Sequence, residues 1–164
     1  MALIYLGLGS NLDAPQQQLL TALETLAQTQ GFELIQTSRF YGSTPQGPQD
    51  QPDYVNAVCL IRSQLTPQQV LDQTQAIEQQ FGRVKTRHWG ERCIDIDILL
   101  YDDLVMASDR LTIPHPFMTQ RDFVLLPLLE IAPDIEIPQH GAAQACMANL
   151  QQTFVKPTGQ LFEK

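Results

Sequence analysis

HWGERCIDIDIL, residues 88–99, predicts a β-strand that carries two carboxylates on one face. Isoleucines alternate with Asp95 and Asp97, which is the pattern of a half-buried strand. Side chains two apart on a strand point to the same face, about 6.5–7 Å apart along it. Asp is disfavoured inside strands, so two of them on one face indicate a functional surface. Such a pair suits hard cations, although a plain solvated strand can show the same alternation.

Cations gather around this predicted strand. The net charge is −8, yet six of the ten lysines and arginines fall between residues 83 and 121. They are Arg83, Lys85, Arg87, Arg92, Arg110 and Arg121. The acidic balance argues against a general binder of nucleic acid or of membrane surfaces. Carboxylates for a metal beside cations for phosphate indicate chemistry on a nucleoside triphosphate.

Length and cysteine content predict a single domain, 1–164, in a reducing compartment. A chain of 164 residues can bury a core without disulfides. Its three cysteines show no close pairing and no zinc-type spacing. We find no secretory signal and no apolar run near the ~18 residues that span a bilayer. We therefore expect a cytoplasmic protein, and a monomer.

Hydrophobic periodicity predicts the order β-α-β-β-α-β up to residue 101. The predicted strands are 3–8, 32–40, 54–61 and the Asp-x-Asp strand, followed by short strands 104–106 and 111–113. Short helices are expected at 123–131 and 142–150, before a frayed tail without a role. We therefore predict an α+β fold, a ferredoxin-like split β-α-β sheet with added C-terminal strands and helices. Helices would cover one face and leave the other open to a ligand.

Local signals set the ends of the two long predicted helices. Asp13 is the expected N-cap of the first, which has Pro15 in its first turn and ends at Gly31. The second begins at Thr66-Pro67-Gln68-Gln69, where Thr66 and Gln69 fit a capping box, and ends at Gly82. The long connection 41–53 and the cationic loop 83–93 are the expected walls of the ligand site.

Five motifs in order resemble those of the 6-hydroxymethyl-7,8-dihydropterin pyrophosphokinase family of folate biosynthesis. They are LGLGSNL (6–12), GPQDQPDYVNA (47–57), HWGERCIDID (88–97), IPHP (113–116) and PLLEIAP (127–133). The resemblance implies transfer of the terminal pyrophosphoryl group of ATP to the pterin hydroxymethyl oxygen, with release of AMP. It also implies that Asp95 and Asp97 bind two Mg²⁺ ions that bridge the phosphates.

The same resemblance implies roles for further residues. Arg83 and Arg92 would be catalytic, because a guanidinium fork clamps phosphate oxygens. The remaining ATP contacts would come from Gln75, Glu78, Lys85, Trp89, Ile98, Arg110, Leu111, Thr112, His115 and Arg121. The pterin contacts would come from Ser43, Thr44, Pro45, Tyr54, Asn56 and Phe123. In the pterin pocket, Asn56 would bind the hydrogen-bonding edge while Tyr54 and Phe123 sandwich the ring.

The chain departs from the family pattern at Ser43, Gln46 and Pro116, and in the length of one loop. The segment between Arg83 and Trp89 is one residue shorter than is usual, so the phosphate-binding basic position falls on Lys85, Arg87 or His88.

Two other functions fit parts of the pattern. A nucleotidyltransferase places Gly-Ser close to its Asp-x-Asp, whereas here Gly9-Ser10 precedes Asp95 by about 85 residues. A non-enzymatic, ligand-binding regulatory domain can share the fold. In that case Tyr54 and Phe123 would be ordinary core aromatics, and Glu78 a solvated charge on a helix. Release of AMP from ATP discriminates the pyrophosphokinase from both.

Overall fold

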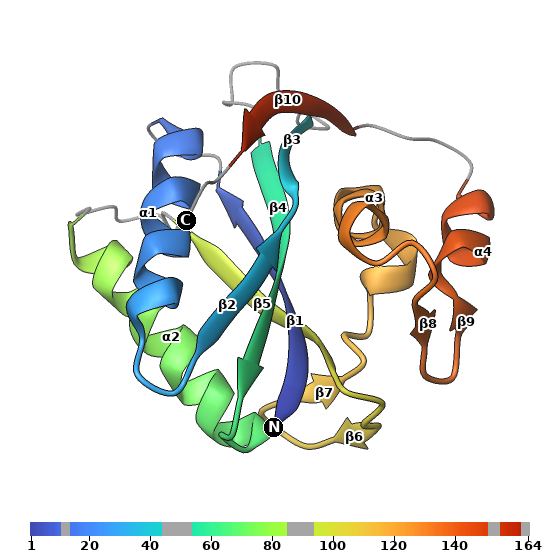
Figure 1. Ribbon diagram of the computed structural model, residues 1–164, viewed down its shortest axis with the longest axis horizontal. Helices are drawn as coiled ribbons and strands as arrows, with labels where there is room; N and C mark the ends of the chain where they lie inside the picture. The colour runs from blue at the N-terminus through green and yellow to red at the C-terminus, as the bar shows by residue number, and fades with distance from the viewer. Residues whose placement is uncertain (11–13, 44–53, 85–93, 151–154, 162–164) are drawn as a thin grey trace.

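A six-stranded antiparallel sheet forms the centre of the computed structural model (Figure 1). The structure describes residues 1–10, 14–43, 54–84, 94–150 and 155–161, with the backbone alone for 43, 82–84 and 155–161. The strands run β10–β3–β4–β1–β5, and β2 also pairs with β4. Their bounds are β1 Ala2–Ser10, β2 Glu33–Thr37, β3 Arg39–Ser43, β4 Tyr54–Ser63, β5 Asp95–Tyr101 and β10 Val155–Leu161. The predicted α+β fold is confirmed.

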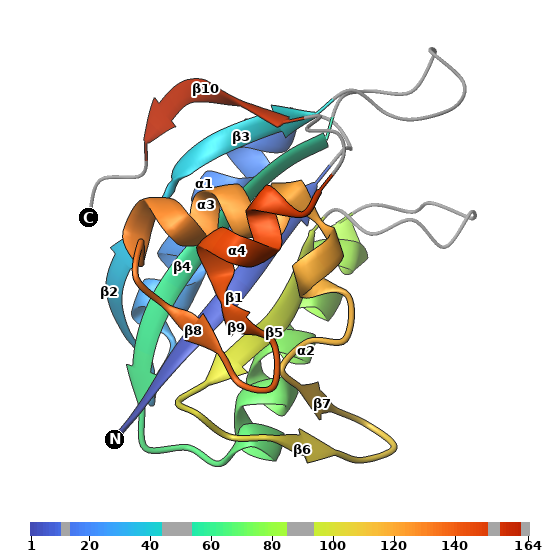
Figure 2. The ribbon, with the colours of Figure 1, turned by 90° about the vertical axis from the view of Figure 1, so that its right-hand side faces the viewer.

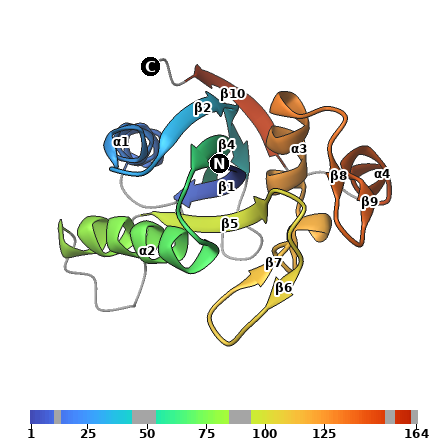
Figure 3. The same ribbon diagram turned by 60° about the horizontal axis from the view of Figure 1, so that its bottom comes forward.

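Helices α1 (Pro15–Gln28) and α2 (Pro67–Val84) cover one face of this sheet (Figures 1 and 3). Alternate side chains of β1, β4 and β5 point toward them. Together with Leu19, Leu23, Leu26, Val70 and Ile77 of the helices they form the larger apolar core. None of the helices described is long and apolar enough to cross a bilayer.

The predicted start of α2 is confirmed, and its predicted end is wrong. The Thr66 N–H donates to Gln69 Oε1 (2.9 Å), and the Gln69 N–H donates to Thr66 Oγ1 (3.2 Å), which closes the capping box. The helix runs past Gly82 to Val84, because one glycine costs a helix only about 1 kcal/mol.

The first helix differs from the prediction at both ends. Ala14 is its N-cap, in a left-handed conformation and without a side-chain cap, and Asp13 lies outside the described residues. The helix ends at Gln28, before Gly31, which adopts the left-handed φ of +92° in the turn that follows.

The predicted strand 32–40 is two strands, broken at Ser38. The Ser38 hydroxyl accepts the Val58 N–H (3.0 Å) and donates to the Arg39 carbonyl (2.7 Å). A buried side chain thus replaces one backbone ladder contact at this point. Beyond it the chain continues as β3, which pairs with β4 at Tyr41–Asn56 and Ser43–Tyr54.

The opposite face of the sheet is partly covered, which corrects the expectation of an open face. The covering elements are η1 (Met118–Gln120), α3 (Asp122–Ile131), the hairpin β8 (Glu136–Ile137) with β9 (Gly141–Ala142), and α4 (Ala143–Ala148). In Figure 2, α3 and α4 lie in front of the sheet. Val124, Leu125 and Leu128 pack against Val58 and Leu99 in a second apolar core.

The C-terminal residues form a strand, so the prediction of a frayed tail is wrong. Val155 pairs with Ser43 and Lys156 with Gly42, and β10 thereby covers the edge of β3. Sequence reasoning missed this strand because β10 contains Pro157 and Gly159, which are rare in strand interiors. The short strands β6 (Met106–Ala107) and β7 (Thr112–Ile113) form a separate hairpin, each within one or two residues of its predicted place.

Candidate active site

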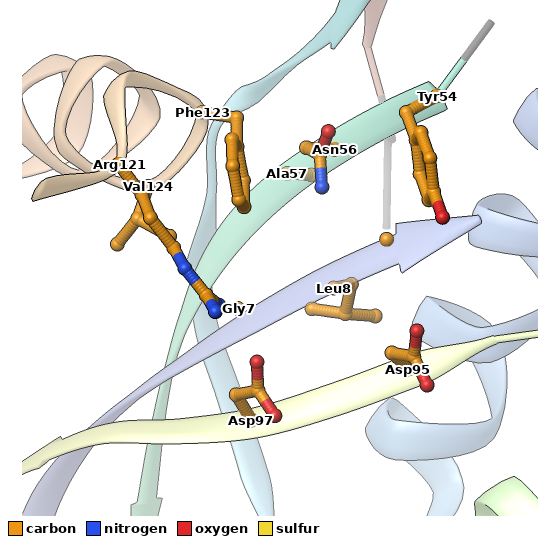
Figure 4. Close-up of a pocket in the computed structure, with 11 residues that line it drawn as sticks. Gly7, Leu8, Tyr54, Asn56, Ala57, Asp95, Asp97, Arg121, Phe123 and Val124 are labelled. Atoms are coloured by element: carbon orange, nitrogen blue, oxygen red, sulfur yellow. The ribbon is translucent and has the colours of Figure 1, made fainter. Parts of the chain in front are cut away.

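A cavity of about 420 Å³ lies on the partly covered face, above the middle strands (Figure 4). Strand register explains why polar residues meet there. Gly9 of β1 pairs with Asn56 of β4 on one side and with Asp95 of β5 on the other. Residues directly opposite on antiparallel strands share a face, so these side chains project into one space. The lining residues are Gly7, Leu8, Gly9, Tyr54, Asn56, Ala57, Asp95, Asp97, Arg121, Phe123 and Val124.

Glycines form the floor of this cavity. A Cβ on Gly9 would lie 2.6 Å from Asn56 Nδ2, which is shorter than any normal contact. A Cβ on Gly7 would meet Leu99 at an ordinary 3.4 Å. Gly9 is therefore needed so that Asn56 can occupy its place beside β1. Sequence reasoning did not assign the two glycines to the site, although two glycines on one face of a strand signal a close backbone approach.

Two aromatic rings stand on either side of Asn56. Figure 4 shows Tyr54, from β4, and Phe123, from the first turn of α3, flanking the Asn56 amide. Asn56 is only 8 % exposed, and within the described part of the chain its Oδ1 has no hydrogen-bond partner. A buried amide oxygen left unpaired is costly. A flat ligand with a hydrogen-bond donor on its edge satisfies this oxygen.

Two carboxylates form the other side of the cavity. Asp95 and Asp97 lie on one face of β5, as predicted, and both line the cavity. Behind the strand, Glu78 of α2 accepts the Ile96 N–H (2.8 Å) through Oε2 and ties the helix to this part of β5. Among the described residues, no group of three or more His, Cys, Asp and Glu side chains gathers into a complete metal site.

His115 lies beside Asp97, with 3.8 Å between Nε2 and Asp97 Oδ2. Its Nδ1 accepts the Phe117 N–H (3.2 Å), so the neutral ring carries its proton on Nε2, toward Asp97. Burial lowers the pKa of His115, and the nearby Arg121 charge adds to that effect, while Asp97 opposes it. His115 is therefore neutral near pH 7.

A second cavity of about 260 Å³ shares Asp97 with the first. The other residues that line it are Leu71, Ile96, Ile98, Ser108, Asp109, Arg110, Leu111, Thr112, His115 and Pro116. At its rim, Arg110 donates to Asp72 Oδ1 (2.7 Å) and to Gln75 Oε1 (3.2 Å). The loop from β6 to η1 and one edge of β5 thus form a site next to the first cavity.

The structure brings together most of the predicted site residues that it describes. Tyr54, Asn56, Asp95, Asp97, Arg121 and Phe123 line the first cavity, and Ile98, Arg110, Leu111, Thr112 and His115 line the second. Gln75 and Glu78 lie on α2 beside them. Ser43 ends β3, and Arg83 lies in the last turn of α2. Thr44, Pro45, Lys85, Arg87, His88, Trp89 and Arg92 lie outside the described residues.

Comparison with known proteins identifies the relatives of this chain. Residues 5–133 match the sequence profile described as 7,8-dihydro-6-hydroxymethylpterin-pyrophosphokinase (HPPK). A Haemophilus influenzae protein named 2-amino-4-hydroxy-6-hydroxymethyldihydropteridine pyrophosphokinase is 51 % identical over 138 residues, which are 84 % of this chain and 86 % of that protein. A Pseudomonas aeruginosa protein of the same name is 42 % identical over 82 % of this chain and 83 % of its own length.

Solved structures show the same fold. Wild-type Plasmodium falciparum HPPK-DHPS matches 90 % of this chain with a TM-score of 0.67 at 15 % identity, and the match covers 43 % of that longer chain. The profile match extends through all five motifs, and the two bacterial relatives each cover more than four fifths of the sequence. This chain belongs to the 7,8-dihydro-6-hydroxymethylpterin-pyrophosphokinase family.

Proposed function

We propose that the chain transfers the pyrophosphoryl group of ATP to the hydroxymethyl oxygen of 6-hydroxymethyl-7,8-dihydropterin and releases AMP. The observation that carries this proposal is the junction of the two cavities at Asp97. In this proposal the first cavity takes the flat heterocycle and the second takes the nucleoside, while Asp97 lines both and Asp95 lines the first. Reaction between two bound substrates requires this adjacency, because catalysis of phosphoryl transfer is mostly positioning and charge stabilisation.

The pterin occupies the space between Tyr54 and Phe123 in this proposal. Both rings offer flat apolar surfaces, which suit offset stacking. Asn56 supplies a donor and an acceptor to the edge of the heterocycle, and its unpaired Oδ1 gains the partner that it lacks. Ser43 at the end of β3, with Thr44 and Pro45 next in the sequence, would complete the pocket.

The donor set fits Mg²⁺. Asp95 and Asp97 offer hard oxygen ligands from one strand face, and no third protein ligand crowds them among the described residues. We propose that they hold two Mg²⁺ ions, with phosphate oxygens and water as the other ligands. When bound, the ions neutralise charge on the phosphates and orient them. His115 lies beside this pair of carboxylates, with its Nε2 3.8 Å from Asp97 Oδ2.

The phosphates of ATP meet the cations of the chain. Arg121 lines the first cavity together with Asp97. Arg83 and Arg92 are proposed as catalytic clamps on the phosphate oxygens, and Lys85 as a further phosphate contact. Arg83 and Lys85 would close over the phosphates together with Trp89 and exclude water, which matters because hydrolysis of ATP is the competing reaction. Ile98, Leu111 and Thr112 bind the nucleoside, with Gln75, Glu78 and Arg110 beside it.

We propose further that residues 1–164 act as one domain, as a monomer in the cytoplasm. The three cysteines without close pairing support a reducing compartment. Light scattering of the purified protein at micromolar concentration tests the monomer. No observation on the structure favours the regulatory domain or the nucleotidyltransferase over the pyrophosphokinase.

The decisive experiment follows ³¹P NMR of the protein with ATP, Mg²⁺ and 6-hydroxymethyl-7,8-dihydropterin. We expect AMP together with a pterin diphosphate, and neither product when the pterin is left out. ADP, free pyrophosphate or unchanged ATP from folded protein would contradict the proposal.

A matched pair of variants tests the pterin pocket. Asn56→Ala should raise the KM for the pterin about tenfold and leave the Kd for ATP unchanged, because it removes one set of hydrogen bonds to the ring. Asn149→Ala, at the C-terminal end of α4, is the control and should change neither quantity. An equal loss of affinity for the pterin and for ATP would show that Asn56 supports the fold rather than binding of the ring.

A further inference from the structure

Phe117 contacts one residue of each substrate cavity and lines neither. It is 53 % exposed and lies outside both apolar cores. A large aromatic residue in such a place gains little from burial. Phe117 instead contacts Arg121 and His115.

The ring of Phe117 lies under the Arg121 guanidinium. The Arg121 Cζ is 5.4 Å from the Phe117 ring centroid and 5.5 Å from that of Phe123. Both distances fall within the range of about 6 Å for cation–π attraction. Arg121 thus lies over the faces of two rings, and one of them, Phe123, belongs to the wall of the ring-binding cavity.

Phe117 also holds His115. Its N–H donates to His115 Nδ1 (3.2 Å), and the two rings meet edge to face with centroids 6.2 Å apart. The backbone contact survives any side-chain substitution other than proline. A change of the Phe117 side chain therefore isolates its effect on Arg121 from the hydrogen bond that sets the His115 tautomer.

The position of Arg121 relative to the two cavities gives the contact with Phe117 its significance. Arg121 lines the first cavity together with Asp97, and Asp97 also lines the second cavity. A free arginine side chain samples many rotamers, and ordering it costs free energy. The two aromatic faces restrict the guanidinium before substrate binds. Less free energy is then needed to order Arg121 for the transfer step.

We propose that Phe117 is a positioning residue, which holds the Arg121 guanidinium between Phe117 and Phe123 and thereby orients it toward the phosphates. This inference rests on the proposed function, because it assigns Arg121 to pyrophosphoryl transfer. Phe117 itself lines neither cavity.

The direct test observes the side chain of Arg121 by NMR. Its ¹⁵Nε–Hε resonance, identified by its loss in Arg121→Lys, should be shifted upfield by ring currents. In Phe117→Leu it should move downfield, and in Phe117→Tyr, which keeps the aromatic face, it should stay in place. An unchanged resonance in Phe117→Leu would overturn the stacked arrangement.

Kinetics on the same variants test the role. Phe117→Leu should lower kcat about two- to fivefold, which corresponds to the strength of an exposed cation–π contact, with KM for ATP unchanged. Phe117→Tyr should restore kcat. Val105→Ala, at a similarly exposed apolar residue, is the control and should leave the Arg121 resonance and kcat as in wild type. A shifted resonance with wild-type kcat in Phe117→Leu would overturn the positioning role.

The two proposals fail separately. If wild-type protein forms no pterin diphosphate, the proposed function is wrong and the positioning role in transfer is wrong with it. The stack itself is judged by the Arg121 resonance, which needs no turnover.

Discussion

The two faces of the central sheet differ in function, although the same strands form both. Toward α1 and α2, every second residue of β1 is apolar and buried, and the layer is closed by leucines. On the other face the same strand presents Gly7 and Gly9, and its neighbours present Asn56, Asp95 and Asp97. The first face stabilises the fold, whereas the second gives up packing to leave room for a ligand. Changes on the two faces should therefore affect different quantities.

The largest effect is expected from Asp97→Ala on the face that holds the cavities. Loss of this carboxylate removes a proposed metal ligand, and we expect kcat to fall by about 10³-fold or more. The free energy of unfolding should change little, because the side chain is 45 % exposed. Turnover and thermal unfolding of the same sample check both statements. Asp103→Asn, in the exposed turn after β5, is the control, and near-normal kcat in Asp97→Ala would contradict the metal assignment.

Leu23→Ala on the helix-covered face should show the reverse behaviour. Leu23 is fully buried in the larger core, so its truncation should cost about 2–5 kcal/mol of unfolding free energy. Activity per folded molecule should stay close to wild type. Urea unfolding together with kcat measured well below the midpoint tests this separation. A large loss of kcat in folded protein would mean that the two faces are not independent.

Gly9→Ala tests the floor of the cavity. The new Cβ would displace Asn56 Nδ2, so we expect kcat/KM for the pterin to fall about tenfold or more, with a cost of about 1–3 kcal/mol in stability. Gly7→Ala is the matched comparison and should be milder on both measures, since its Cβ meets Leu99 at a normal distance. Equal effects of the two substitutions would show that Asn56 moves aside freely.

The smallest effect is expected on stability at alkaline pH, from the contact between α3 and β3. Glu130 of α3 accepts the Tyr41 hydroxyl (2.6 Å) and the Arg39 N–H (3.0 Å). Burial, and then the Glu130 carboxylate, raise the pKa of Tyr41 from 10.0 to about 12. The unfolded chain therefore releases this proton first as pH rises. The stability contributed by neutral Tyr41 is complete below pH 10 and is lost toward pH 12.

Tyr41→Phe should consequently flatten the alkaline limb of the stability curve between pH 10 and 12. Thermal unfolding across that range measures the slope, and absorbance at the tyrosinate band follows the titration itself. An equally steep limb in Tyr41→Phe would assign the alkaline loss to other groups, such as Tyr5 and Tyr101, whose pKa values burial also raises.

Much of the fold and part of the site follow from local patterns. The alternation of β5 and the capping box at Thr66 are both confirmed. Both could be predicted because they depend on neighbouring residues alone. The five motifs were enough to indicate the family. Element ends were less predictable: α2 continues past Gly82, because packing against the sheet outweighs the low helix propensity of one glycine.

Other features depend on contacts between distant residues. The break at Ser38 exists because Val58, twenty residues later, donates to its hydroxyl. The strand β10 forms because the edge of β3 offers unpaired backbone groups to a segment with weak strand character of its own. Neither contact leaves a local pattern in the sequence.

Local sequence patterns are enough to identify the types of groups in this protein: a strand with two carboxylates, a set of cations close together in the sequence, and the motifs of a pyrophosphokinase family. The fold is needed to bring Asn56, Gly9 and Asp95 side by side, and to place Arg121 over Phe117 and Phe123. The difference lies in the distance along the chain over which each kind of interaction acts. Periodicity and capping act within a few residues, whereas strand register and packing are set by the whole sheet at once.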